Sequence, residues 1–144
     1  MRLLLCALVL ALAGCSSTPM APHTTAPPRS WLGMDPGDAR TFTGSAGRLL
    51  LVVADEAYSI DGENVGALIW REGSDYTTDY VLEDADGTVR WYGRKGSWRA
   101  GRHGAEPREV SIVDGTARFG DRTITLADGG PVELATPDGT YQAD

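Results

Sequence analysis

Short runs of β-prone residues, separated by Asp-Gly and other glycine-containing turns, recur from about residue 40 to the end of the chain. The runs are rich in Val, Ile, Thr, Tyr and Trp, which is typical of strands. Asp-Gly pairs suit tight hairpin turns because glycine accepts a positive φ. The connections are too short for parallel crossovers, which need a dozen or more residues. The expected fold is therefore all-β, an antiparallel meander that forms a small half-barrel or sandwich.

Composition and bounding turns locate the individual strands. They are predicted at Leu49–Ala54, Val65–Arg71, Thr77–Glu83, Thr88–Gly93, Glu109–Val113, Thr116–Phe119, Arg122–Leu126 and Pro131–Leu134. The stretch Ala54–Ile60 is expected to form one helical turn. The apolar cluster Trp31-Leu32-Gly33-Met34 is predicted to mark the point where the chain docks on the domain.

Two hairpins make predictions about register. A two-residue turn at Asp86-Gly87 would pair Glu83 with Arg90, and would gather on one face Tyr80, Leu82, Val89 and Trp91. The alternative is a longer turn over Asp84-Ala85-Asp86-Gly87 with a bulge, which would shift the pairing by one residue. In the second hairpin the predicted partners are Val113 with Thr116, Ile112 with Ala117 and Val110 with Phe119, with Ile124 continuing the apolar row.

The first residues have the three parts of a secretory signal peptide: positive Met1-Arg2, the apolar run Leu3–Leu12, and small residues after it. The sequence Leu12-Ala13-Gly14-Cys15 resembles the lipobox of bacterial lipoproteins at all four positions. That resemblance implies cleavage before Cys15 and a thioether between its thiol and diacylglycerol. Two acyl chains anchor a protein durably, whereas one chain binds only marginally.

Three segments follow from this interpretation. Residues 1–14 are the cleaved signal peptide, residues 15–30 are the lipidated Cys15 and a Pro/Ser/Thr-rich tether, and residues 31–144 are the β-rich domain. Fifteen tether residues in an extended, polyproline-like chain reach at most ~45 Å. The expected partner is a lipid bilayer, reached through the diacylglyceryl group, on the extracytoplasmic side of the cell membrane. With Cys6 removed and Cys15 acylated, the domain has no disulfide.

Several function classes are disfavoured by composition and spacing. The chain has 144 residues, enough for one ordinary domain, and a net charge of −7, whereas nucleic-acid binders are normally basic. Asp84-x-Asp86-Gly87 lacks the other ligands of a calcium loop, and the lone domain histidine, His103, cannot form a normal zinc site. No nucleophile elbow and no haem, metal or nucleotide signature is present in the sequence. We therefore expect no cofactor and no enzymatic activity.

Charge is segregated along the sequence. Residues 55–86 contain ten acidic residues and one arginine, whereas residues 90–108 contain six basic residues and one acid, interleaved with aromatics. One interpretation is a cationic, aromatic-lined surface for an anionic cell-envelope polymer or a protein partner, made by Arg90, Tyr92, Arg94, Arg99 and Arg102. The favoured alternative is internal pairing, in which the basic strand lies beside the acidic one and the tryptophans belong to the core.

The segment 79–107, DYVLEDADGTVRWYGRKGSWRAGRHGAEP, is similar to one in uncharacterised exported bacterial proteins and lipoproteins. They share D-x-D-G-x-V-x-x-Y/F-G followed by G-S-W-x-A-G-x-x-G-A-x-P. The resemblance implies a β-rich exported domain and assigns no catalytic residue. In this segment Gly96, Gly101 and Gly104 are expected to permit a tight irregular crossing, and Trp98 is expected to plug the sheet.

The sequence favours a membrane-anchored lipoprotein with a non-enzymatic binding or envelope-support role. Two alternatives stay open. The acidic domain would suit inhibition of a cationic, envelope-targeting hydrolase such as lysozyme, and a cavity inside the sheet would suit a small-ligand carrier.

Overall fold

The computed structural model describes residues 31–144, so the predicted signal peptide, Cys15 and tether lie outside the described residues. The described residues form thirteen strands and no helix: β1 (Ala39–Gly44), β2 (Gly47–Val53), β3 (Tyr58–Ile60), β4 (Glu63–Glu72), β5 (Asp75–Glu83), β6 (Val89–Arg94), β7 (Trp98–Arg99), β8 (Arg108–Glu109), β9 (Ile112–Val113), β10 (Thr116–Phe119), β11 (Arg122–Ala127), β12 (Gly130–Thr136) and β13 (Gly139–Ala143). Within residues 31–144 no helix is long and apolar enough to span a membrane.

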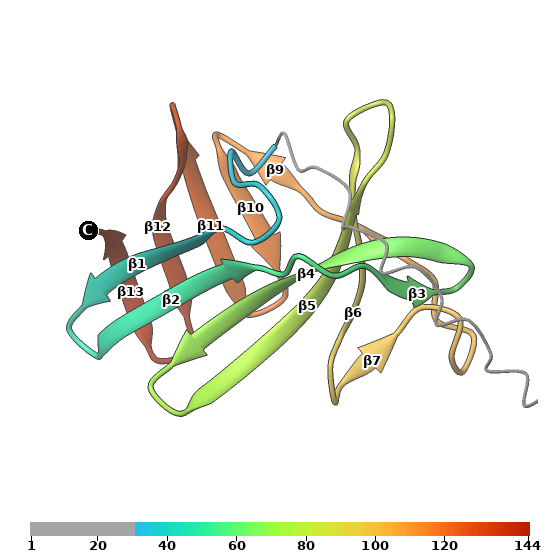
Figure 1. Ribbon diagram of the computed structural model, residues 1–144, viewed down its shortest axis with the longest axis horizontal. Coiled ribbons are helices and arrows are strands. Elements are labelled where there is room, and N and C mark those ends of the chain that lie inside the picture. The colour runs from blue at the N-terminus through green and yellow to red at the C-terminus, as the bar shows by residue number, and fades with distance from the viewer. Residues whose placement is uncertain (1–30) are drawn as a thin grey trace, which may run out of the picture.

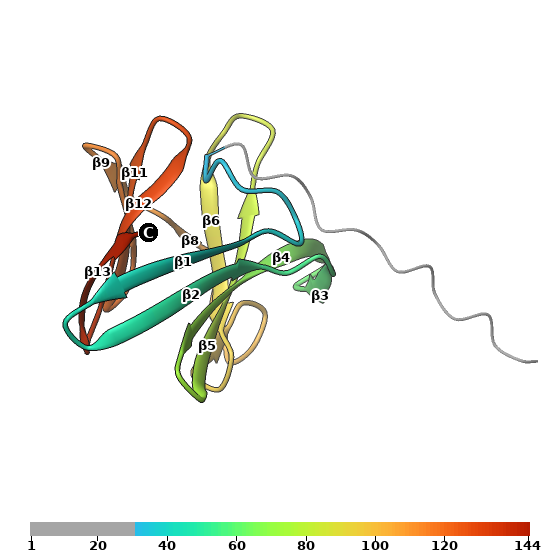
Figure 2. The ribbon, with the colours of Figure 1, turned by 60° about the vertical axis from the view of Figure 1, so that its left-hand side comes forward.

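All strand pairs are antiparallel, and the sheet order is β7-β6-β5-β4-β2-β1-β13-β12-β11-β10-β9. Two meanders, one from each half of the domain, are joined where β1 pairs with β13. The sheet curls, so that the C-terminal strands form one wall and β4, β5 and β6 the other, with β1 and β2 between them (Figures 1 and 2). The predicted all-β meander, curled as a half-barrel, is confirmed.

One short segment bridges the two ends of the curled sheet. Its start, β8, pairs with β6, and the Val110 amide donates to the Val89 carbonyl at 2.8 Å. Its end, β9, pairs with β10. The sequence predicts one continuous strand over Glu109–Val113, but the segment changes partners midway, so its pairing is split into two short ladders.

The predicted strands all overlap strands of the structure, but four strands were missed: β1, β3, β7 and β13. The helical turn predicted over Ala54–Ile60 is wrong, because Tyr58–Ile60 pairs with the start of β4. β1 and β13 are rich in Thr, Gly and Ala, and each buries one aromatic side chain, Phe42 or Tyr141. Their strand character comes from pairing with each other and with neighbours, which local composition does not report.

The sheet buries apolar residues on both faces. The large cluster lies inside the curl and contains Trp70, Phe119 and Leu32, each with no exposed surface. The smaller cluster lies on the outer face of β4, β5 and β6 under β3, and includes Val65, Tyr80, Tyr92 and Ala100. The docking predicted for Trp31–Met34 is confirmed, since Leu32 and Met34 are buried in the large cluster.

The hairpin between β5 and β6 follows the longer turn, not the two-residue one. The Asp84 amide donates to the Thr88 carbonyl and the Gly87 amide to the Asp84 carbonyl, at 2.8 and 2.9 Å. Glu83 therefore faces Val89, and the predicted Glu83–Arg90 pair is wrong. The predicted apolar face is also wrong, because Val89 and Trp91 join the inner cluster while Tyr80 and Leu82 lie on the outer face.

A β-bulge in β6 then shifts the pairing with β5 back by one residue, to the register predicted for the two-residue turn. The register shifts between Tyr80 and Val81, so that Val81 faces Trp91 whereas Tyr80 faces Gly93. Tyr92 is the extra residue. Because a bulge adds one residue to one strand, Trp91 and Arg94 point to the same, inner face although three positions separate them.

The second hairpin has the predicted register. Thr116 faces Val113 and Ala117 faces Ile112, and Ile124 faces Ala117 on the next strand. Val110 and Phe119 are both buried in the inner cluster, but the Val110 amide bonds to β6, so the ladder ends before that pair.

Gly93 is required by the bulge. Its φ is +143°, and a Cβ there would lie against the carbonyl oxygen of Trp98 and 2.8 Å from Cα of Arg99. We expect Gly93→Ala to lower the free energy of unfolding by more than about 1 kcal/mol, because strain and collision with β7 add. Gly87→Ala is the matched control, since φ is +84° there but nothing lies within 4 Å. Equal denaturation midpoints for the two variants would contradict the steric account.

Candidate functional site

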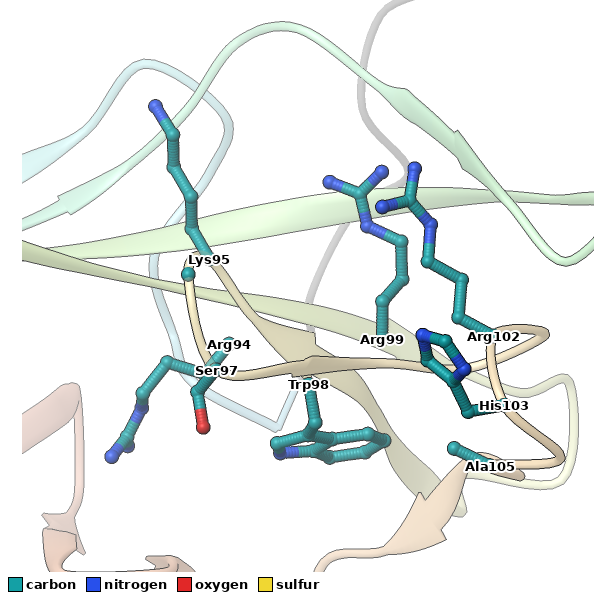
Figure 3. A pocket seen from close by; sticks show the side chains of 9 residues that line it. Arg94, Lys95, Ser97, Trp98, Arg99, Arg102, His103 and Ala105 are labelled. Atoms are coloured by element: carbon teal, nitrogen blue, oxygen red, sulfur yellow. The ribbon is translucent and has the colours of Figure 1, made fainter.

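The basic segment is divided between the two faces of the sheet at the end of β6. Arg94 points inward beside Trp91, whereas Arg99 and Arg102 lie on the outer side with Lys95 (Figure 3). This division follows from the bulge at Tyr92. It separates residues with structural partners from residues with free charges.

Arg94 belongs to a buried polar network centred on Asp79. The Asp79 carboxylate has no exposed surface and accepts hydrogen bonds from Arg94 Nε at 2.9 Å and Arg94 Nη2 at 3.1 Å. It also accepts the indole N–H groups of Trp70 and Trp91, at 2.9 and 3.0 Å. Arg94 further donates to Asp121 and to the Phe119 carbonyl, at 2.6 and 3.0 Å. The network ties β5 and β6 to β10 across the inside of the curl.

Two opposing effects act on the pKa of Asp79 in this network. Burial raises the pKa of the Asp79 carboxyl, and the Arg94 guanidinium and the two indole N–H groups oppose that rise. The hydrogen bond from Arg94 lowers the pKa of the exposed Asp121 carboxyl. Arg94 therefore bridges one buried and one exposed carboxylate, and its single positive charge is not available to a ligand.

Arg90 and Tyr92 are also occupied by the fold. The Arg90 guanidinium forms an ion pair with Asp84, its neighbour across the hairpin. Tyr92 is 6% exposed and packs in the outer cluster, where burial raises the pKa of its phenol. The internal-pairing interpretation is thus confirmed for Arg90 and Arg94, although Arg90 pairs with Asp84 and not with Glu83.

Arg99 and Arg102 line an open hollow of about 330 Å³ at the end of β6. It is formed by the turn after β6, by β7 and by the loop that follows, and its lining is Arg94, Lys95, Gly96, Ser97, Trp98, Arg99, Arg102, His103 and Ala105. We call this the cationic hollow. Figure 3 shows Lys95, Arg99 and Arg102 extending to one side of the ribbon, while Arg94 and Trp98 extend to the other.

Two tight turns hold the cationic side chains in place. In the first, the Ser97 amide donates to the Arg94 carbonyl at 3.0 Å, which puts Lys95 at the tip, and Gly96 has φ +79°. In the second, the Arg102 amide donates to the Arg99 carbonyl at 3.3 Å, and Gly101 has φ +78°. A positive φ at the third position is the requirement of a type II turn, which glycine satisfies. The expected tight crossing at Gly96, Gly101 and Gly104 is confirmed.

Two of the three outer-face cations of the hollow, Lys95 and Arg99, rest on aromatic rings and not on carboxylates. Lys95 Nζ lies 5.7 Å from the centre of the Tyr76 ring, and the Arg99 guanidinium lies 5.4 Å from that of Tyr80. Within residues 31–144 no carboxylate lies within 4 Å of the charged groups of Lys95, Arg99 or Arg102. A cation on a ring face keeps its charge, so the hollow can bind an anion.

The rest of the basic segment supports Trp98. The Arg108 guanidinium stacks 4.1 Å from the Trp98 ring and 5.7 Å from the Trp91 ring, and the two indoles meet edge to face at 5.0 Å. Trp98 is half-buried against the inner cluster, as expected for a residue that plugs the sheet. These contacts stiffen the strand end that carries Arg99.

A second hollow, of about 660 Å³, lies at the β1–β2, β4–β5 and β12–β13 turns and is acidic. Its carboxylates are Glu72, Asp75 and Asp138. Glu72 accepts the hydroxyls of Thr136 and Tyr141, at 2.8 and 3.0 Å, and pairs with the buried Arg122. Sequence analysis singled out neither this hollow nor Lys95. Glu72 and Asp138 are far apart in sequence, whereas Lys95 lies in the basic run that indicated the first site.

The described residues contain no group of three or more His, Cys, Asp or Glu side chains placed to hold a metal ion. The geometry at the cationic hollow suits binding of an anionic group by guanidinium and ammonium donors. Compared with protein families, with curated proteins and with solved structures, the chain has no significant match.

Proposed function

We propose that this chain is an exported, lipid-anchored protein with a non-enzymatic role, and that its β domain binds an anionic polymer of the cell envelope. The lipobox-like Leu12-Ala13-Gly14-Cys15 supports the anchor. The similarity of residues 79–107 to exported bacterial proteins is consistent with that location. The cationic hollow supports the choice of ligand.

One observation carries the binding proposal: three cations lie together at one hollow and none has a carboxylate partner among the described residues. Four arginines of residues 31–144 form ion pairs, namely Arg48, Arg90, Arg94 and Arg122, whereas the three cations of the hollow share one site without such a pair. Like charges at one hollow repel each other, most strongly Arg99 and Arg102 at the two ends of one turn, and this repulsion costs free energy. A ligand that brings negative charge would relieve this repulsion.

Cys15→Ala tests the anchor. We expect the variant to leave the membrane fraction, or to accumulate as the uncleaved precursor, because the thiol that would receive diacylglycerol is gone. Membrane fractionation and metabolic labelling with a fatty acid measure both outcomes. Cys6→Ala is the control and should behave as the wild type, because Cys6 lies in the predicted signal peptide. A mature, membrane-bound Cys15→Ala protein would contradict the lipoprotein proposal.

Charge reversal tests the ligand site. We expect Arg99→Glu with Arg102→Glu to weaken sedimentation with isolated cell envelopes by roughly tenfold or more, since charge-assisted hydrogen bonds are replaced by repulsion. The matched control is Arg71→Glu with Arg118→Glu, which changes the net charge equally at two other exposed arginines. Circular dichroism of both variants checks the fold. Equal retention of both variants would remove the hollow from the proposal.

A second candidate function follows from the acidic hollow. Asp75 and Asp138 are exposed beside Glu72, in a chain of net charge −7, and would attract a cationic hydrolase such as lysozyme. Inhibition of lysozyme by the wild-type protein, lost in Asp75→Asn with Asp138→Asn, would support this role. Absence of inhibition would exclude it.

A further inference from the structure

The three cations of the hollow are not equivalent. Arg99 and Arg102 are the first and last residues of one tight turn, whose ends lie within about 7 Å of each other. Lys95 belongs to the preceding turn, and Figure 3 shows its side chain extending to the same side as the two arginines but apart from them. The hollow thus offers a guanidinium pair and a separate ammonium group.

These two positions form a row along the edge of the sheet. Arg99 faces Gly93 and Trp98 faces Arg94, so Lys95 lies beyond the paired residues, in the turn that joins β6 to β7. Lys95 is two residues from Gly93, the partner of Arg99, and two residues of strand span about 6.6 Å. A single small anion would contact the guanidinium pair alone, whereas a chain with repeated negative groups would also reach Lys95.

The outer face beside this row has exposed aromatic surface. Tyr76, which lies under Lys95, is 61% exposed, and Tyr58 packs against Tyr80 at a ring separation of 5.2 Å. Rings at the rim present flat apolar surface next to the charges. This combination suits a polymer whose repeating unit has both an apolar face and a negative group.

The hollow lies away from the end at which the predicted tether joins the domain. The Trp31 amide donates to the Glu83 carboxylate at 3.4 Å, at the last residue of β5. Tyr76 lies at the opposite end of the same strand, about 23 Å away at ~3.3 Å per residue. Figure 1 shows the start of the described chain and β7 at opposite ends of β6. The hollow and the point where the predicted tether joins therefore lie at opposite ends of β5.

From these observations we infer that the ligand of the cationic hollow is a linear polyanion, a glycopolymer with repeated phosphate or carboxylate groups. The guanidinium pair of Arg99 and Arg102 binds one negative group and Lys95 binds a second. This inference rests on the proposed function, because it names the ligand class of the same hollow.

The test measures binding of the purified full chain to anionic oligomers of increasing length. Oligogalacturonates supply carboxylates and oligomers of glycerol phosphate supply phosphates, so the two series distinguish the chemical source. We expect affinity to rise by roughly tenfold from the monomer to an oligomer long enough to reach Lys95, the gain of one further charge-assisted contact. The better series identifies the negative group. A uniform affinity for all lengths in both series would overturn the inference.

Lys95→Gln separates the two positions. We expect it to abolish the gain with length while leaving the weak binding of the monomer unchanged, because the guanidinium pair is intact. Arg118→Gln, at an exposed arginine on β10, is the matched control and should keep the gain. Retention of the full gain in Lys95→Gln would refute the two-position geometry.

Vesicles with and without anionic lipid test whether lipid headgroups are the ligand of the hollow. Preferential binding of the hollow to anionic vesicles, lost in Arg99→Gln with Arg102→Gln, would overturn the polymer assignment in favour of headgroups. A failure of this inference can be distinguished from a failure of the proposed function. If envelope binding needs the two arginines but neither oligomer series binds with increasing affinity, the inference is wrong and the hollow remains the binding site.

Discussion

Replacing Arg94 with Met is expected to lower the free energy of unfolding by about 3–5 kcal/mol, the cost of leaving one member of a buried ion pair without its partner. Asp79 has no exposed surface, and Arg94 provides two of its four hydrogen bonds. The remaining indole donors cannot neutralise a negative charge. Chemical denaturation of the variant and the wild type at pH 7 measures the difference.

The loss should depend on pH. Burial raises the pKa of Asp79, and Arg94→Met removes the charge that opposes the rise. The folded variant therefore binds a proton more readily than the unfolded chain, whose Asp pKa is about 3.9. Stability gained by protonation increases as the pH falls from the raised pKa towards the unfolded value. We expect the deficit relative to the wild type to shrink as the pH is lowered from 7 towards about 4.

Two further variants make the test specific. Arg118→Met, at an exposed arginine, should change stability by no more than about 0.5 kcal/mol. Asp79→Leu with Arg94→Met removes both charges and should recover part of the loss, but the Trp70 and Trp91 indoles then lack an acceptor, at about 1–3 kcal/mol each. A pH-independent deficit in Arg94→Met would show that Asp79 is not the group left unpaired.

Phe119→Ala should be comparably damaging, at about 3–5 kcal/mol, because it empties the centre of the inner cluster. Phe119 has no exposed surface, and its ring lies 6.0, 6.4 and 6.0 Å from the rings of Trp31, Trp70 and Trp91. Those rings come from the docking segment, β4 and β6, so the cavity cannot collapse without moving three separate elements. The change removes edge-to-face contacts as well as buried area.

Thermal denaturation should show this loss as a fall in Tm on the order of 10 °C. Val113→Ala is the control, since Val113 is 62% exposed on β9, and its stability should stay within about 0.5 kcal/mol of the wild type. Phe119→Leu, which keeps most of the volume, should lose less than Phe119→Ala. A small loss for Phe119→Ala would mean that the inner cluster rearranges around the missing ring.

The class of fold was predictable because it depends on local chemistry. Alternating apolar residues and Asp-Gly turns appear within a few residues of each other, and hairpins such as β9–β10, which turns at Asp114-Gly115, follow from them. Local chemistry does not predict β1 and β13. Pairing across about a hundred residues forms these strands from Thr- and Gly-rich sequence. Long-range pairing has no local signature, because its favourable terms depend on residues elsewhere in the chain.

The sequence suggested five residues for the candidate site, namely Arg90, Tyr92, Arg94, Arg99 and Arg102. Their side chains serve different purposes in the structure, and sequence alone does not separate them. Arg94 neutralises Asp79, Arg90 pairs with Asp84, and Arg99 keeps a free charge over Tyr80. Pairing preference is similar for each arginine, so the distinction depends on the face of the sheet that each one occupies and on the carboxylates within its reach.

The residue order by itself determined that this chain forms antiparallel strands joined by tight turns, since both depend on short-range sterics and hydrophobic alternation. Only the tertiary structure decided which of its basic side chains are paired with carboxylates and which face solvent. A single extra residue at Tyr92 rotates Arg94 inward to a buried carboxylate and leaves Lys95, Arg99 and Arg102 on the outer face. The physical reason is that side chains alternate with a period of two along a strand, so one bulged residue reverses which side chains meet the core and which meet solvent.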